Sequence, residues 1–249
     1  MKKDWVRLIV SDTHLGTVHS KEEELLGLLR DLHYDELVLA GDIFEFLRQP
    51  IFTNTTKQII DLINSKPKRT IYIVGNHDEA FKAFTGTTIA NIEFMNRYDF
   101  DYNGRKFRIE HGDAYDTGLV KWRYTIQFIS LIQNMVERVF NLDLTTWWAN
   151  RSIKKRKLRR IWDIIKWNED ADVFIMGHLH NPEVLIWVDK NEKIKTYINS
   201  GDWIDNCTYV IVKDGQVRLR KYEPGFLDED TTDTITIPIE KTETKTVPV

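Results

Sequence analysis

The sequence has very little cysteine and no long apolar run. Cys207 is the only cysteine among 249 residues, which excludes an internal disulfide and indicates a reducing compartment. No signal peptide is expected before the first strand-like segment, and no stretch approaches the roughly 20 apolar residues that span a bilayer. The sequence therefore predicts a cytoplasmic protein, with room for peripheral contact with the inner face of a membrane.

An excess of either charge is also missing. The chain has 35 Lys and Arg against 38 Asp and Glu, so no global attraction to nucleic acid or anionic lipid is expected. The local exception is residues 151–160 (RSIKKRKLRR), with basic side chains at seven of ten positions. This segment could grip an anionic or amphiphilic substrate, rest on an anionic membrane, or hold single-stranded nucleic acid. A solvated basic helix face is an equal alternative.

The pattern of apolar residues predicts an α/β fold. In the first half, strands alternate with helices, which favours a sheet that is partly parallel. The expected strands are Trp5–Val10, Glu36–Ala40 and Thr70–Val74, and the expected helices are Lys21–Leu32, with Ser20 as N-cap, and Thr55–Asn64. Later segments are rich in short strands, with hairpin turns at Asn103-Gly104 and Asp214-Gly215. Two sheets packed face to face, with helices outside, are expected.

Residues 118–169 interrupt the strand series. They have helical patterning and contain five of the eight tryptophans, so an inserted helical subdomain is expected there. The main domain is expected to cover residues 1–225. The remaining tail, residues 226–249, is rich in Thr, Glu and Lys and is expected to be extended or disordered.

Polar residues follow five of the predicted strands. Because ligands gather at the carboxyl ends of strands in open α/β sheets, these five loops could converge on one site. Five of the seven histidines lie in them, accompanied by Asp and Asn, and this ligand mix without thiolate suits Mn, Fe or Zn. The segments are Asp12-Thr13-His14, Gly41-Asp42, Gly75-Asn76-His77-Asp78, His111-Gly112-Asp113 and Gly177-His178-Leu179-His180.

This order of motifs resembles the calcineurin-like metallophosphoesterases. The resemblance implies a four-layer α/β/β/α sandwich with an inserted helical lid, holding two divalent ions, with Mn expected first. It implies hydrolysis of a phosphodiester or pyrophosphate bond by a metal-bridging hydroxide. By the family's pattern, Asp12, His14 and His180 bind one ion, Asn76, His111 and His178 bind the other, and Asp42 bridges both.

The family's motif also places a histidine where His77 stands. As imidazolium, His77 could stabilise the transition state or protonate the leaving oxygen, with Asp78 or a neighbouring carboxylate orienting it. The alternative is that His77 only hydrogen-bonds its loop. Glu45 is open to two interpretations, support of the site or capping of a helix, and Trp203 is expected in the core.

A narrower resemblance concerns the substrate. Residues 111–116 (HGDAYD), 199–203 (NSGDW) and 206–209 (NCTY), with the inserted helices, resemble the UDP-2,3-diacylglucosamine pyrophosphatase branch. This similarity implies an amphiphilic substrate like a UDP-sugar lipid, although well-known lipid A members carry Arg at the position of His77. Two alternatives are a nuclease acting on single-stranded nucleic acid and, ranked last because every expected ligand is present, a non-catalytic scaffold.

Overall fold

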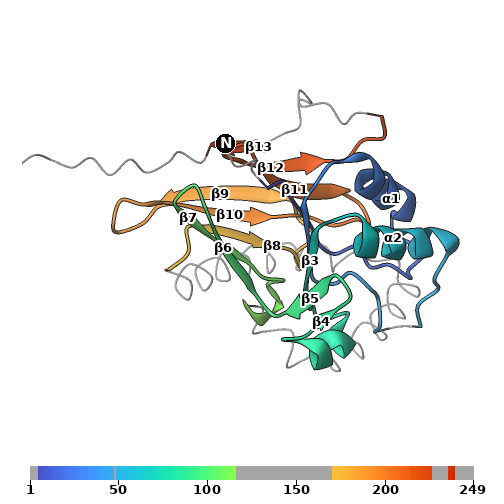
Figure 1. Ribbon diagram of the computed structural model, residues 1–249. Helices are drawn as coiled ribbons and strands as arrows, with labels where there is room; N and C mark the ends of the chain where they lie inside the picture. The colour runs from blue at the N-terminus through green and yellow to red at the C-terminus, as the bar shows by residue number, and fades with distance from the viewer. Residues whose placement is uncertain (1–4, 48, 116–169, 226–234, 239–249) are drawn as a thin grey trace, which may run out of the picture. The chain divides into compact units, whose positions relative to one another are not determined.

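The computed structural model describes residues 5–47, 49–115, 170–225 and 235–238 (Figure 1). The chain divides into two units, Met1–Gly112 with Asp170–Val249, and Asp113–Glu169. All elements below belong to the first unit, except the 3-10 turn η2 (Asp113–Tyr115). The predicted helical insertion, residues 118–169, lies outside the described residues. So does the tail 226–249, apart from residues 235–238.

The first sheet has eight strands, and its centre is parallel. β1, β2, β3 and β5 run in the same direction, while β11, β12 and β13 form an antiparallel extension on one edge and β4 lies on the other. The order is β13-β12-β11-β1-β2-β3-β5-β4. The strands are β1 (Arg7–Val10), β2 (Glu36–Ala40), β3 (Arg69–Ile73), β4 (Thr88–Ile89), β5 (Ile92–Met95), β11 (Thr208–Lys213), β12 (Gln216–Lys221) and β13 (Ile235–Pro238).

The second sheet has five strands in the order β6-β7-β8-β10-β9. Its three central strands are parallel, and β6 and β9 flank them in the antiparallel sense. The predicted hairpin at Asn103-Gly104 joins β6 to β7, and both turn residues have the positive φ that a tight hairpin needs. The strands are β6 (Tyr98–Tyr102), β7 (Arg105–Ile109), β8 (Val173–Met176), β9 (Glu183–Val188) and β10 (Ile194–Asn199).

Alternate side chains of the two sheets share one apolar core. Ile9, Val38 and Ile71 of the first sheet belong to the same buried cluster as Ile109 and Val173 of the second. At the margin of this core, the Tyr98 hydroxyl of β6 donates to the Glu36 carboxylate of β2 at 3.1 Å. The predicted sandwich of two sheets is confirmed.

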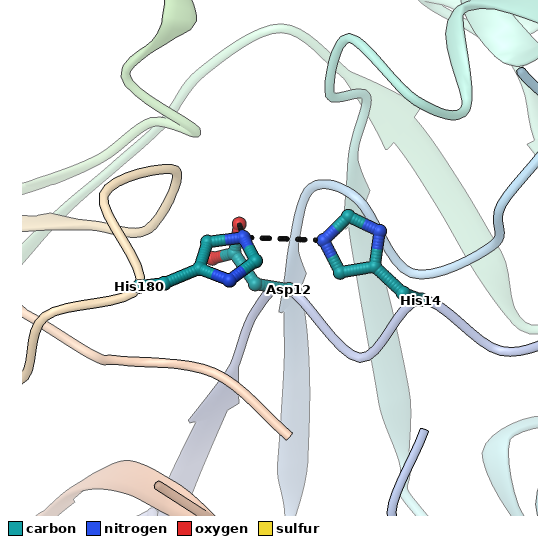
Figure 2. A group of neighbouring side chains, drawn as sticks. All are labelled: Asp12, His14 and His180. Atoms are coloured by element: carbon teal, nitrogen blue, oxygen red, sulfur yellow. Dashed lines mark hydrogen bonds and ion pairs between the residues drawn. The ribbon is translucent and has the colours of Figure 1, made fainter. Parts of the chain in front are cut away.

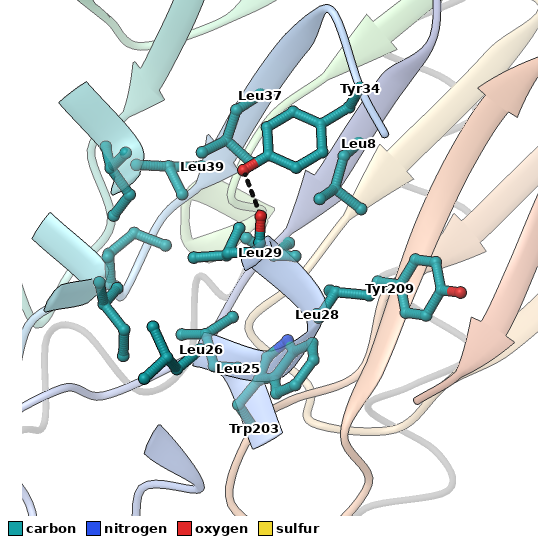
Figure 3. Packing of buried hydrophobic residues seen from close by; sticks show 14 of the residues in the cluster. Leu8, Leu25, Leu26, Leu28, Leu29, Tyr34, Leu37, Leu39, Trp203 and Tyr209 are labelled. Atoms are coloured by element: carbon teal, nitrogen blue, oxygen red, sulfur yellow. Dashed lines mark hydrogen bonds between the residues drawn. The ribbon is translucent and has the colours of Figure 1, made fainter. Parts of the chain in front are cut away.

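Helices cover the other face of the first sheet. Figure 1 shows α1 (Glu22–Asp31) and α2 (Asn54–Ser65) side by side next to this sheet. Leucines of α1 pack against strand side chains such as Leu8 and Leu37 and against the fully buried Trp203, which confirms Trp203 as a core residue (Figure 3). A six-residue 3-10 helix, η1 (Glu79–Phe84), follows the loop after β3. Within the described residues, no helix is long and apolar enough to cross a membrane.

The two helices begin differently. Thr53 caps α2, and Thr53 and Thr56 exchange the reciprocal bonds of a capping box. The prediction that Ser20 caps α1 was wrong, because the N-cap residue is Lys21 and no side chain accepts a capping bond there. Ser20 instead donates its hydroxyl to the Thr13 carbonyl at 2.7 Å, so this side chain supports the loop after β1.

Gly27 in the middle of α1 allows close packing of Tyr222. A Cβ at position 27 would collide with the hydroxyl of Tyr222, a buried residue. Gly to Ala in a helix usually stabilises by about 1 kcal/mol, but we expect Gly27→Ala to lower the free energy of unfolding. Urea unfolding of Gly27→Ala, Tyr222→Phe and the double variant measures the coupling. Additive effects, or a stabilised Gly27→Ala, would contradict the close contact.

Candidate metal centre

The loops that follow strands of both sheets meet at one place. His111, after β7 of the second sheet, donates from Nδ1 to the Ala40 carbonyl at the end of β2, at 3.0 Å. The backbone N–H of His178, after β8, donates to the Asp12 carboxylate after β1, at 2.9 Å. Because parallel strands end on the same side, the sandwich brings five distant segments together, as the sequence predicts.

The first cluster consists of Asp12, His14 and His180 (Figure 2). The two Nε2 atoms of His14 and His180 face each other at 3.2 Å, and His180 Nε2 lies 3.3 Å from Asp12 Oδ1. One ligand atom from each residue lies within 4.8 Å of the others. The structure thus brings together the three residues that the resemblance assigns to one ion.

The second cluster consists of Asp42, His111 and His178, with Asn76 beside them. Since His111 Nδ1 donates to Ala40, a neutral His111 ring carries its lone pair on Nε2. That atom faces two oxygens at 3.2 Å, Oδ2 of Asp42 and Oδ1 of Asn76. Three electron-pair donors pointing at one another form an arrangement that a cation would stabilise.

Both carboxylates of the centre are buried, with 0% of Asp12 and 1% of Asp42 exposed. Burial would raise the pKa of Asp12, but the hydrogen bond from His180 and the charges of His111 and His180 outweigh it and lower this pKa. Burial would also raise the pKa of Asp42, but the hydrogen bond and the charge of His111 outweigh it and hold this pKa well below its usual range. Both groups are therefore held as anions, the form that binds metal ions.

The histidines of the first cluster respond in opposite directions. Burial lowers the pKa of His14 and outweighs the attraction of Asp12 and Asp42. For His180, burial also lowers the pKa, but the hydrogen bond with Asp12 and its charge outweigh burial and leave this pKa raised. A neutral imidazole is the ligand form, so His14 already favours the state that binds metal.

The backbone of these loops is strained. Five of the seven predicted ligands have positive φ angles between 45° and 66°, a region that residues other than glycine rarely adopt. They are Asp12, His14, Asp42, His178 and His180. Two neighbouring glycines allow the close approach, since a Cβ at Gly75 would collide with Asp42 and one at Gly177 with Asp12.

His77 lies between the two clusters and contacts Glu45. Its Nδ1 is 2.6 Å from Glu45 Oε2, its Nε2 is 3.9 Å from Asp42 Oδ2, and its backbone N–H donates to Asp42 Oδ1 at 2.7 Å. The Glu45 side chain caps none of the helices in the described residues. Of the two interpretations open from the sequence, the geometry favours support of the site. The spacing Gly41-Asp42-x-x-Glu45 is the sequence feature from which this role of Glu45 could be predicted.

Asp78 does not contact His77 through its carboxylate. The side chain is fully buried and accepts from the backbone N–H groups of Gly75 and Ile43 and from the Tyr72 hydroxyl, at 2.6 to 2.9 Å. Its pKa is raised, mainly by burial. Asp78 therefore ties the loop after β3 to the loop after β2, and Glu45 is the carboxylate that orients His77.

The residues present fit two divalent cations. Two anionic carboxylates, an amide oxygen and four imidazoles supply hard and borderline ligands without thiolate, the set that Mn, Fe and Zn accept. In both clusters the ligand atoms converge: His14 Nε2 faces His180 Nε2, and His111 Nε2 faces oxygens of Asp42 and Asn76. A third group, His14, Glu45 and His77, shares His14 with the first.

Solved structures of two known proteins are similar to this chain. Vacuolar Protein Sorting 29 from Cryptosporidium parvum is 15% identical with a TM-score of 0.51, and the alignment covers 96% of this chain and 100% of that chain. Yfce, a phosphoesterase from E. coli, is 15% identical with a TM-score of 0.49 over 94% and 100% of the two chains. At such identities the likeness concerns the fold alone. No curated protein matches the sequence.

The family comparison is more specific. The calcineurin-like phosphoesterase family matches residues 7–204, which is more than half of the chain and includes all seven predicted ligands. The order of the motifs, the two-sheet sandwich and the clustered Asp, Asn and His side chains agree with this match. The chain belongs to the calcineurin-like phosphoesterase family.

Proposed function

We propose that the chain hydrolyses phosphodiester or pyrophosphate bonds with the help of two divalent cations, Mn first, Fe or Zn alternatively. The observation that carries this proposal is the facing arrangement of Asp42, Asn76 and His111 next to the cluster of Asp12, His14 and His180. Two such ions, when bound, would lower the pKa of a shared water and neutralise charge on the phosphoryl oxygens.

Asp42 is proposed to serve both clusters. Its Oδ2 faces His111, and its charge acts on Asp12, His14 and His180 of the other cluster. A carboxylate has two oxygens and can contact two neighbouring cations, which an amide or imidazole does less well. The backbone N–H of His77 fixes Oδ1 and so limits rotation of this side chain.

His77 is proposed to hold a proton for the leaving oxygen. Its Nδ1–H donates to Glu45, so the Nε2 atom faces the centre near Asp42. A protonated Nε2 could stabilise charge on a phosphoryl oxygen or pass its proton to the departing group. The side chain is 29% exposed, which leaves it accessible to a substrate.

For the substrate, we propose an amphiphilic phosphoester similar to a UDP-sugar lipid. The support is the similarity of residues 111–116, 199–203 and 206–209 to the UDP-2,3-diacylglucosamine pyrophosphatase branch. The basic residues 151–160, through which membrane or single-stranded nucleic acid contact is proposed, lie outside the described residues. A nuclease and a non-catalytic scaffold are the two alternatives, and a substrate screen distinguishes them.

A metal-supplemented screen tests the reaction and separates the alternatives. We expect Mn-dependent hydrolysis of bis(p-nitrophenyl) phosphate, lost on chelation, and faster turnover of a UDP-sugar lipid than of single-stranded DNA. Preference for DNA would favour the nuclease. No hydrolysis of any monoester, diester or pyrophosphate with Mn, Fe or Zn would favour the scaffold.

Asp42→Asn removes the anionic charge between the two clusters. We expect kcat/KM for bis(p-nitrophenyl) phosphate to fall at least about a hundredfold, because Asp42 is the anionic residue that would serve both cation sites. Asp61→Asn makes the same chemical change on the exposed face of α2 and serves as the matched control. Equal turnover by Asp42→Asn and the unchanged protein would reject the proposed centre.

His77→Ala tests whether His77 donates a proton to the leaving group, because leaving groups differ in how much they need one. p-Nitrophenolate departs readily without a proton, whereas a sugar alkoxide needs one. We therefore expect kcat to fall about 10² to 10⁴-fold on a dinucleotide diester and much less on the matching p-nitrophenyl ester. Equal losses on the two substrates would show that His77 does not act as the acid.

A further inference from the structure

Glu45 is a buried carboxylate that forms no ion pair with a lysine or an arginine among the described residues. It is 6% exposed and lies three positions after Asp42. Its backbone N–H donates to the Leu15 carbonyl at 3.0 Å, and its Oε1 accepts from the Leu47 N–H at 2.9 Å. These bonds hold the side chain in place and leave Oε2 directed at the metal centre.

Two histidines with different roles face this one oxygen. Glu45 Oε2 lies 2.6 Å from Nδ1 of His77 and 3.4 Å from Nδ1 of His14. The two rings are perpendicular, with an interplanar angle of 89° and centroids 4.7 Å apart. One carboxylate oxygen has two lone pairs and can therefore attract an N–H from each ring.

We propose that Glu45 is a positioning residue for both halves of the centre, orienting the predicted ligand His14 and the predicted acid His77 through the same oxygen. The inference rests on the proposed function in the roles it gives to these two histidines. The new element is a link between the two histidines: Glu45 orients the predicted acid His77 and also sets the metal affinity of the first cluster through His14.

The chemistry of imidazole explains how this link works. A proton held on Nδ1 of His14 by Glu45 leaves the lone pair on Nε2, the atom that faces His180 and Asp12 in the first cluster. A carboxylate behind a ligating histidine raises its basicity and fixes its tautomer, and loss of such a partner typically weakens metal binding about 10- to 100-fold. For His77, the same contact leaves Nε2 facing Asp42.

Calorimetric titration of the full chain with MnCl₂ tests the link. We expect Glu45→Gln to weaken one of two Mn sites about 10- to 100-fold and to leave the other unchanged. His77→Ala, the control, removes the acid but keeps Glu45 beside His14, and both Mn affinities should stay within about threefold of the unchanged protein. Glu45→Asp, too short to reach both rings, should fall between. Equal Mn affinities in Glu45→Gln and the unchanged protein would overturn the inference.

A metal-free measurement separates this inference from the proposed function. Long-range ¹H–¹⁵N spectra report which imidazole nitrogen carries the proton, and we expect Nδ1–H for both His14 and His77. Glu45→Gln should shift the ¹⁵N signals of both rings together, with His19 as an unaffected reference. Failure of either ring to respond would overturn the inference whether or not the chain hydrolyses phosphoesters. Hydrolysis failing while both rings respond would reject the proposed function alone.

Discussion

The packing of lone pairs against lone pairs is the constraint on which this centre depends. Asp12 and Asp42 are buried anions. Each accepts a backbone N–H, from His178 and His77, and each lies 3.2 to 3.3 Å from the Nε2 atom of a ligand histidine. A buried charge that loses its partner costs about 3 to 5 kcal/mol. Such an arrangement is unfavourable by itself and becomes favourable around cations. It therefore indicates a cation-binding site and not a contribution to the stability of the fold.

Many packing contacts and hydrogen bonds of the fold hold these groups together and offset the unfavourable energy of bringing them close. The apolar core between the sheets fixes the strand ends, and hydrogen bonds of Asp78 and Ser20 then stabilise the loops. Positive φ angles at five predicted ligands are sustained because both ends of each loop are anchored in a strand or helix. Local strain at the site is thus offset by packing elsewhere in the sandwich.

Much of this could be predicted from the sequence, because strand periodicity and motif order are properties of short segments. The five polar loops, the two hairpins and the sandwich all follow from such patterns. The partner of His77 does not follow from such a pattern. Asp78 is adjacent in sequence but accepts from the Tyr72 hydroxyl, while the carboxylate that contacts His77 belongs to Glu45, in a different loop. The prediction that Ser20 caps α1 was wrong for the same reason. The Ser20 hydroxyl donates to the Thr13 carbonyl, and this contact depends on how the loop after β1 packs.

The division of the chain leaves every predicted ligand in one unit. All seven predicted ligands, together with His77 and Glu45, lie in residues 12–111 and 178–180, on the two sides of the unit Asp113–Glu169. That unit follows the predicted ligand His111 after one residue, Gly112, so its attachment is adjacent to the centre along the chain. Changes within residues 113–169 therefore alter no predicted ligand, and membership of the family constrains the reaction more than the substrate.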